Sequence, residues 1–202
     1  EKATNSLKSA LENQNISYVT AHGEGAFYGP KIDLHVKDAI GRRWQLSTIQ
    51  VDFAQPDNFD LQFVDSNNKR VKPVMIHRAL LGSIERFTGI LIENYAGEFP
   101  GWLSPVQVKV LTIGDVSNYL NKITKSLKGF RYEVDDRNLR LGEKLHDASK
   151  DKIPITLIVG EKDELSNTLA INIRSQDNQQ NVKYEDAIKQ IKANLKTPIF
   201  KI

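Results

Sequence analysis

Residues 154–160, PITLIVG, form an apolar run broken by one threonine, and this run constrains the fold more than any other segment. A half-exposed strand alternates polar and apolar residues, so this run predicts a strand buried on both faces. The neighbouring patterns predict strands at 106–113, 130–135 and 168–174 and helices at 114–129, 141–149 and 184–195. We therefore expect an α/β unit that contains a βαβ motif, with helices covering a parallel or mixed sheet.

The first half of the chain has a different pattern, which predicts an antiparallel sheet with few helices. Two long alternating segments flank a short turn and predict a β-hairpin. The expected elements, in order, are a helix ending at 13–15, a strand at 16–20, the glycine-rich loop GEGAFYGPK at 23–31, hairpin strands at 32–36 and 43–53, a short strand at 60–64 and a helix at about 75–96.

The segment GEFPGWLSP at 97–105 separates the halves, because its two prolines and two glycines cannot continue a helix. We place a domain boundary near Leu103, which gives domains 1–103 and 104–202. The first domain carries 11 Lys and Arg against 12 Asp and Glu, and the second carries 17 against 13. This positive excess fits a phosphate-rich partner, although ordinary solvated surfaces also carry such an excess.

Composition excludes several kinds of site. The sequence has no cysteine, so disulfides and thiolate metal ligands are excluded, and four histidines and the carboxylates remain as metal ligands. No run of 18 apolar residues and no secretory leader is visible, which predicts a cytoplasmic protein without a membrane span. No glycine-rich phosphate motif follows an expected strand, so a Rossmann or Walker nucleotide site is not predicted.

The segment VMIHRALLGSIERF at 74–87 is mostly apolar but carries charged and small residues. As a helix, it places an apolar stripe on one side and Gly82, Ser83 and Arg86 on another. Small residues let a flat ligand come close, and a guanidinium offers planar donors suited to phosphate. The alternative is a helix packed on a sheet, with Arg86 paired to a carboxylate.

The strings YGPKIDLHVKDAIGRRWQLSTIQVDF at 28–53 and VMIHRALLGSIERFTGILIENYAGEFPGWLSPVQV at 74–108 resemble the C-terminal part of bacterial-type threonyl-tRNA synthetases. The helical segment matches motif 3 of the class II synthetases. The resemblance covers nearly the whole chain and implies an antiparallel-sheet remnant of the catalytic domain, 1–103, followed by an α/β anticodon-binding domain, 104–202. The implied reaction joins threonine to its tRNA through threonyl adenylate, with ATP and Mg²⁺.

The resemblance implies roles for residues of the first domain. Arg86 is expected to bind the ATP phosphates, with Gly82 and Ser83 lining the adenosine site. His77 matches one ligand of a catalytic Zn²⁺ whose other ligands lie upstream in the family, whereas a lone histidine otherwise indicates a hydrogen-bonded core residue. The expected catalytic residues are Lys31, Gln50 and Arg86, and the other implied substrate-binding positions are Tyr28, Gln45 and Thr48. From the strand pattern alone, the polar residues of 43–53 could equally lie on an exposed face.

In the second domain the resemblance implies contacts with the tRNA anticodon. The implied positions are Asn138, His146, Lys152, Asp163 and Asn172. Relatives often carry arginine at His146, Lys152 and Asn172 and glutamate at Asp163, and the loss of bidentate donors weakens base recognition. Arg137, Arg140, Lys144 and Arg174 are either phosphate contacts or solvated surface charges.

Motifs 1 and 2, the dimer contacts and two zinc ligands of the family are not found in these residues. We therefore expect the chain alone to lack aminoacylation activity, whereas the complete enzyme is a homodimer that binds tRNA(Thr), ATP and threonine. The missing initial methionine and the start within a domain favour a piece of a longer enzyme. The alternatives are a naturally truncated, non-catalytic tRNA-binding or regulatory paralogue, and part of a sister synthetase. The string HRALLGSIERF, beginning at His77, favours the threonyl branch, and the catalytic-type residues argue against an independent binding module.

Overall fold

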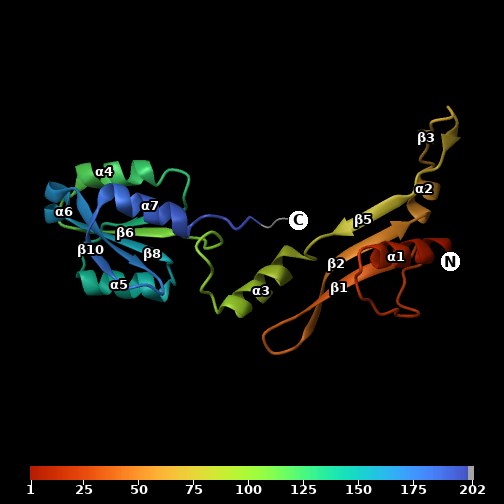
Figure 1. Ribbon diagram of the computed structural model, residues 1–202, viewed down its shortest axis with the longest axis horizontal. Coiled ribbons are helices and arrows are strands. Elements are labelled where there is room, and N and C mark those ends of the chain that lie inside the picture. Colours follow the sequence, from red (N-terminus) through yellow and green to blue (C-terminus); the bar gives the residue numbers. More distant parts are fainter. Residues whose placement is uncertain (200–202) are drawn as a thin grey trace. The chain divides into compact units, whose positions relative to one another are not determined.

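The computed structural model describes residues 1–199, and the chain divides into two compact units, Glu1–Asn94 and Tyr95–Ile202 (Figure 1). Each unit has its own sheet. The boundary expected near Leu103 falls within the second unit and stays a prediction. No helix within residues 1–199 has the length and apolar character needed to cross a lipid bilayer.

The first unit is built on an antiparallel sheet of three strands in the order β1-β2-β5. Its elements are α1 (Lys2–Asn13), β1 (Lys31–Lys37), β2 (Arg43–Asp52), α2 (Ala54–Asn58), β3 (Phe63–Val64), β4 (Arg70–Val71), β5 (Met75–Ala79) and α3 (Ile84–Tyr95). The predicted hairpin of β1 and β2 is confirmed. The Asp38 carboxylate forms the turn by accepting the backbone N–H groups of Ile40 and Arg42.

The long helix expected at 75–96 is wrong over its first third. Met75–Ala79 is a strand that pairs with β2, and α3 begins only at Ile84. Gly82 adopts a φ of +68°, which a helix does not allow, and Ser83 caps α3 by accepting the Arg86 N–H on its hydroxyl at 3.2 Å. The helical face expected to join Gly82, Ser83 and Arg86 therefore does not exist, and His77 lies on a strand.

A second expectation, the strand at 16–20, is also wrong. This segment forms no ladder and only follows the end of α1, where the Ile16 N–H donates to the Leu11 carbonyl. An alternating pattern makes a strand only when another strand offers its backbone groups. The strand expected at 60–64 is reduced to Phe63–Val64, which pairs with β4.

A β-bulge interrupts the β1–β2 hairpin. Leu34 faces Ser47 while His35 faces Gln45, so Leu46 is an extra residue on β2. An extra residue shifts the alternation of side chains along the strand. Gln45 therefore shares a sheet face with Thr48, although their odd spacing in the sequence places them on opposite faces of a regular strand.

The second unit is the predicted α/β fold. Its elements are β6 (Val108–Ile113), α4 (Ser117–Ser126), β7 (Tyr132–Asp135), α5 (Leu141–Lys150), β8 (Ile155–Gly160), α6 (Glu161–Ser166), β9 (Thr168–Ile173), β10 (Gln179–Lys183) and α7 (Tyr184–Asn194). The sheet order is β10-β9-β8-β6-β7, with β6 parallel to both β7 and β8 and with β9 and β10 antiparallel to their neighbours. The sequence pattern did not indicate α6 or β10.

Helices cover both faces of this five-stranded sheet, with α4 and α7 on one face and α5 on the other (Figure 1). The core lies between the sheet and the first pair of helices, where Leu157, Ile171, Ile123 and Ile191 are almost fully buried. The central position of β8 explains its apolar sequence, because strands β6 and β9 flank it and helices cover it. Burial of this apolar surface supplies most of the stability of the unit.

Candidate functional site

One face of the first unit's sheet gathers most of the polar side chains expected in the catalytic domain. Lys31 pairs with Gln50, and Gln50 pairs in turn with His77, so these three residues form a row across β1, β2 and β5. Directly opposed residues of antiparallel strands point to the same face. Thr48 lies two residues from Gln50 on that face, and the bulge at Leu46 adds Gln45.

Asp33 links three of these side chains and was not predicted as a site residue. Its Oδ1 accepts hydrogen bonds from Gln45 Nε2 and Thr48 Oγ1, each at 2.7 Å, and its Oδ2 accepts Lys31 Nζ at 2.5 Å. Burial raises the pKa of Asp33, but the hydrogen bonds, first from Lys31 and then from Thr48, outweigh burial and leave the pKa below its usual value. The sequence signal was an acidic residue two positions after Lys31, on the same strand face.

His77 pairs with a buried carboxylate that was also not predicted. Its Nε2 lies 2.7 Å from Oδ2 of Asp52, whose side chain is 2% exposed, while the His77 side chain is 46% exposed. The other oxygen of Asp52 accepts the N–H groups of Ala54 and Gln55 and so begins α2. His77 is therefore hydrogen-bonded through one nitrogen, with Nδ1 remaining.

A histidine held by a carboxylate is common among metal ligands, and His77 fits that arrangement as a single ligand. Among residues 1–199, however, no group of three or more histidine, aspartate or glutamate side chains lies close enough to hold a metal ion. The described part of the chain does not form a zinc site by itself. Zinc binding stays a prediction.

The glycine-rich loop is fixed to the end of β2. The N–H groups of Val51 and Phe53 donate to the carbonyls of Pro30 and Tyr28 at 3.1 and 3.2 Å. Between these bonds, a Cβ on Gly29 would lie 1.9 Å from the Val51 carbonyl oxygen, so only glycine fits. The backbone of Tyr28 is thereby held beside Phe53, at the end of β2.

Arg86 is exposed on the first turn of α3 and pairs with no carboxylate among residues 1–199. Its guanidinium carbon lies 5.7 Å from the centre of the Trp44 ring, and its Nη1 donates a long 3.4 Å bond to the Gln45 carbonyl. The alternative interpretation, a carboxylate partner for Arg86, is therefore wrong for the described residues. Gly82 lies nearby in the preceding loop, where its Cβ position is 3.0 Å from the Leu46 carbonyl oxygen.

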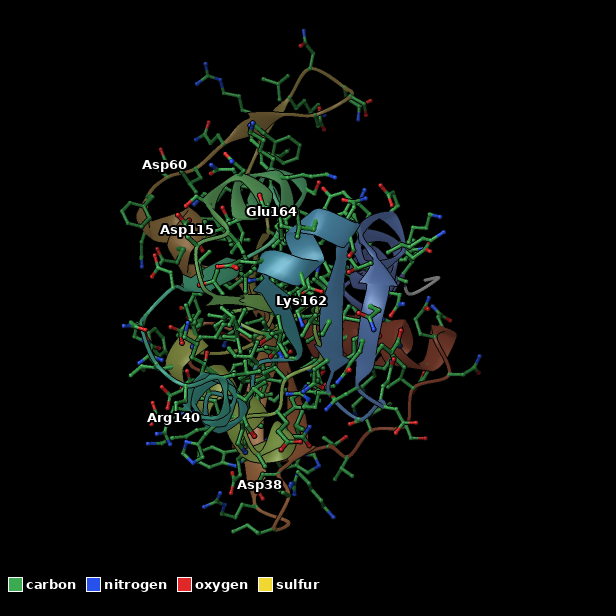
Figure 2. The ribbon with its side chains drawn as sticks, turned by 90° about the vertical axis from the view of Figure 1, so that its left-hand side faces the viewer. Asp38, Asp60, Asp115, Arg140, Lys162 and Glu164 are labelled. Atoms are coloured by element: carbon green, nitrogen blue, oxygen red, sulfur yellow. The ribbon has the colours of Figure 1, made fainter. Side chains whose placement is uncertain are left out.

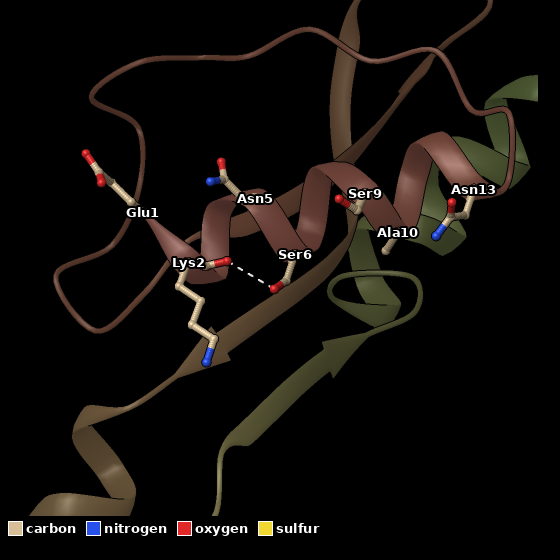
Figure 3. A pocket seen from close by; sticks show the side chains of 7 residues that line it. All are labelled: Glu1, Lys2, Asn5, Ser6, Ser9, Ala10 and Asn13. Carbon is tan, nitrogen blue, oxygen red and sulfur yellow. Dashed lines mark hydrogen bonds between the residues drawn. The ribbon is translucent and has the colours of Figure 1, made fainter.

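A surface depression on the first unit lies apart from the residues of this polar face. It has a volume of about 740 Å³ and follows one side of α1 (Figure 3). Its lining residues are Glu1, Lys2, Asn5, Ser6, Ser9, Ala10 and Asn13. The Ser6 hydroxyl already donates to the Lys2 carbonyl, and none of the expected site residues lines the depression.

The expected anticodon residues lie at different places in the second unit. Asn138 is exposed in the loop after β7, and the His146 side chain on α5 is 78% exposed. Asn172 is half-buried on β9 between the buried Ile171 and Ile173, so it points to the sheet face that α5 partly covers.

The other two anticodon positions hold local structure. Asp163 Oδ2 accepts the Gly160 N–H at 3.0 Å and Oδ1 accepts the Thr168 hydroxyl at 3.3 Å, which caps α6. Lys152, just beyond α5, donates from Nζ to the Ala96 carbonyl. Because Lys152 precedes β8 whereas Asn138 and Asp163 follow parallel strands, Lys152 lies at the opposite edge of the sheet.

The four basic residues considered for phosphate contacts separate into two groups. Lys144 is buried and donates to the carbonyls of Thr112 and Asp135, and Arg174 donates to the carbonyls of Lys152, Glu98 and Phe99. The interpretation of Lys144 as a solvated surface charge is therefore wrong, whereas Arg174 is half-buried and its phosphate contact stays a prediction. Arg137 pairs with Asp135 and Asp147 at 2.6 and 2.8 Å, and its hydrogen bonds lower the pKa of Asp135 to about 2. Arg140 is exposed in the loop after β7 and is labelled in Figure 2.

Comparison with known families identifies both units. Residues 3–95 match the tRNA synthetase class II core domain (G, H, P, S and T), and residues 107–194 match the anticodon binding domain. The chain therefore joins part of a class II aminoacyl-tRNA synthetase core to an anticodon-binding domain.

Individual relatives narrow this class. The chain is 51% identical to the threonine–tRNA ligase of Clostridium tetani over 179 residues, which are 87% of the chain and 28% of the relative. It is 47% identical to that of Petrotoga mobilis over 199 residues, 97% of the chain and 31% of the relative. The chain belongs to the threonyl-tRNA synthetase family and spans about a third of the length of these relatives.

Solved structures agree with this assignment and confirm the predicted fold class. The crystal structure of the RNA binding domain of threonyl-tRNA synthetase from Cryptosporidium parvum is 32% identical, with a TM-score of 0.84, over 96% of this chain and 50% of that chain. The putative threonyl-tRNA synthetase ThrRS-1 from Aeropyrum pernix is 28% identical, with a TM-score of 0.61, over 95% of this chain and 48% of that chain.

Proposed function

We propose that the chain works within a threonine–tRNA ligase, where the second unit binds the anticodon of tRNA(Thr) and the first supports ATP-dependent activation of threonine. The observation that carries this proposal is the succession of two matched families, a class II core segment and an anticodon domain, in a chain 45 to 51% identical to several threonine–tRNA ligases. The homodimer expected for the complete enzyme stays a prediction.

The polar face of the first unit supports the activation half of this proposal. Asp33 holds the ammonium of Lys31 beside the amide of Gln45, so the lysine is oriented before a ligand arrives. Arg86 carries a positive charge that no carboxylate among the described residues neutralises, as a phosphate-binding group requires. In this proposal Mg²⁺, bound with ATP, neutralises further phosphate charge.

Zinc fits the proposal only if His77 supplies one ligand and residues beyond those that the structure describes supply the others. His77 would supply Nδ1 as one ligand, with the ring orientation set by Asp52. The metal would select threonine through its hydroxyl and amino groups, as the family resemblance implies. Because the described residues supply a single ligand, we expect ATP–pyrophosphate exchange by the purified chain alone to be absent.

The anticodon half of the proposal depends on polar side chains that remain accessible in the second unit. Asn138 and His146 are exposed, and Asn172 is half-buried on the sheet face next to α5. Amide and imidazole groups can hydrogen-bond to the edges of unstacked bases. Lys152 lies at the opposite edge of the sheet and donates to the Ala96 carbonyl, so the proposal does not depend on it.

The test is binding of the purified chain to tRNA(Thr) and to the same tRNA with a changed anticodon, from 50 to 200 mM salt. We expect a preference for the native anticodon that persists at high salt, since base contacts depend less on counterion release than phosphate contacts do. Equal, salt-sensitive binding of both RNAs would refute anticodon recognition.

A pair of matched substitutions localises the binding surface. Asn138→Ala removes an exposed amide next to α5, and Asn121→Ala removes an exposed amide from α4, on the opposite face of the sheet. We expect the first variant to weaken tRNA(Thr) binding by about 5- to 100-fold, the range for losing a base contact, and the second to leave it unchanged. Equal effects of the two variants would exclude the α5 side as the binding surface.

A further inference from the structure

We infer that Trp44 is the residue that positions Arg86 for an anionic ligand. Trp44 lies on β2, one residue before Gln45 and paired with Val36, and its ring centre lies 5.7 Å from the guanidinium carbon of Arg86 on α3. This inference rests on the proposed role of Arg86 in binding nucleotide phosphates. It adds Trp44, a residue that is not among the site residues named above, together with the hairpin turn that holds it.

The Trp44 ring is itself held by the hairpin turn. Its Nε1–H donates to Asp38 Oδ2 at 2.8 Å, and the Asp38 side chain is only 1% exposed. The same carboxylate accepts the backbone N–H groups of Ile40 and Arg42. A buried carboxylate with this many donors is strongly fixed, so the indole it binds is fixed as well.

Helix α3 meets this turn at two points on one side. Arg42 Nη2 lies 2.8 Å from both carboxylate oxygens of Glu93, and Arg86 lies over Trp44. Arg86 and Glu93 are seven residues apart, which is close to two helical turns, so they lie on the same face of α3. The two contacts orient that face of the helix toward Trp44.

The two arginines at the ring differ in how their charge is balanced. Arg42 lies 5.6 Å from the ring centre and has Asp38 and Glu93 as partners. Arg86 lies at a similar distance and has no carboxylate partner within the described chain. An aromatic ring orients a guanidinium without cancelling its charge, whereas a carboxylate does both. Trp44 therefore holds Arg86 in place and leaves its charge available to phosphate.

The experiment uses tripolyphosphate as the probe and Trp44 as the reporter. The chain has two tryptophans, so Trp102→Phe leaves Trp44 as the sole indole, and binding is followed by its fluorescence and by calorimetry. We expect tripolyphosphate to change the Trp44 emission and Arg86→Met to abolish both the change and the binding. Trp44→Leu, measured by calorimetry, should weaken binding about 2- to 30-fold, and Trp44→Phe, which keeps an aromatic face, should restore part of this loss.

The control is Arg43→Met, which removes the same charge from an exposed neighbouring position on β2 and should leave the fluorescence change intact. If Arg86→Met abolishes binding while Trp44→Leu does not weaken it, the positioning role of Trp44 is refuted and the phosphate role of Arg86 stands. If Arg86→Met has no effect, or the parent chain does not bind tripolyphosphate, the phosphate role itself is refuted, and the inference about Trp44 with it.

Discussion

Lys144 is a buried cation whose removal gives a demanding test of the second unit. Its residue is 2% exposed on α5, and its Nζ donates to the carbonyls of Thr112 at 2.8 Å and Asp135 at 3.1 Å. These carbonyls lie near the carboxyl ends of β6 and β7, so one side chain joins the helix to two strands. The substitution Lys144→Met keeps the length of the side chain and removes its charge and donors.

The expected loss follows from the two hydrogen bonds. A hydrogen bond to a charged group contributes about 1.5–3 kcal/mol to stability. The methionine variant loses these bonds but also avoids the cost of desolvating a buried ammonium, so the net loss is smaller than the sum of the two bonds. The two carbonyls stay buried and lose their charged donor. We therefore expect Lys144→Met to lower the free energy of unfolding of this unit by about 2–4 kcal/mol. With a urea dependence of about 2 kcal/mol per molar, the unfolding midpoint falls by about 1–2 M.

The assay is urea unfolding followed by Trp102 fluorescence in a Trp44→Phe background, since Trp102 reports on the second unit alone. Lys150→Met is the matched control, because Lys150 is exposed on the same helix and should change stability by less than about 0.5 kcal/mol. Equal midpoints for the two variants would show that the buried ammonium contributes nothing net, and the reasoning about Lys144 would be wrong.

Two further predictions concern a backbone position and a pKa. Gly29→Ala should destabilise the first unit by at least about 1 kcal/mol, because its Cβ would meet the Val51 carbonyl oxygen at 1.9 Å. Gly25→Ala meets no atom within 4 Å and should be nearly neutral, and urea unfolding followed by Trp44 fluorescence compares them. Hydrogen bonds from Arg137 lower the pKa of Asp135 from 3.8 to about 2, so this carboxylate stabilises the fold fully above about pH 4 and loses that effect as the pH falls toward 2. In Arg137→Gln the pKa of Asp135 should rise toward its usual value, and unfolding free energies between pH 5 and 2.5 should fall less steeply than in the parent chain; equal slopes would contradict this assignment.

The sequence predicted those helices and strands whose local residue pattern is compatible with only one kind of secondary structure. The apolar run of β8 and the helix patterns around it indicated a parallel or mixed sheet covered by helices, and the observed sheet is mixed. Strand β5 escaped prediction because its spacing also suits a helix and its partner, β2, is distant in the sequence. The positive φ of Gly82 and the capping hydroxyl of Ser83 were the local signals that separate β5 from α3.

The roles of the candidate site residues stay predictions, and the structure shows only which of these residues lie together. Lys31, Gln50 and His77 do form one row across the sheet, but the sharing of a face by Gln45 and Thr48 depends on a bulge that no pattern indicated. Asp33 and Asp52 were missed because a carboxylate on a strand is ordinary in sequence. Their importance follows only from which donors the fold brings to them.

Several basic side chains of the second unit are bonded within the protein, so net charge is a poor indicator of RNA binding. The second half of the chain has four more basic than acidic residues. However, Lys144 and Arg174 donate hydrogen bonds to backbone carbonyls, and Arg137 forms ion pairs with two carboxylates. These charges hold the ends of strands and the segment before β6 rather than a phosphate backbone. We therefore predict that affinity for tRNA in this unit depends more on accessible polar groups such as Asn138 and His146 than on the positive excess. For that reason anticodon preference, rather than total affinity, distinguishes a domain that recognises the anticodon bases from a basic surface that binds any RNA.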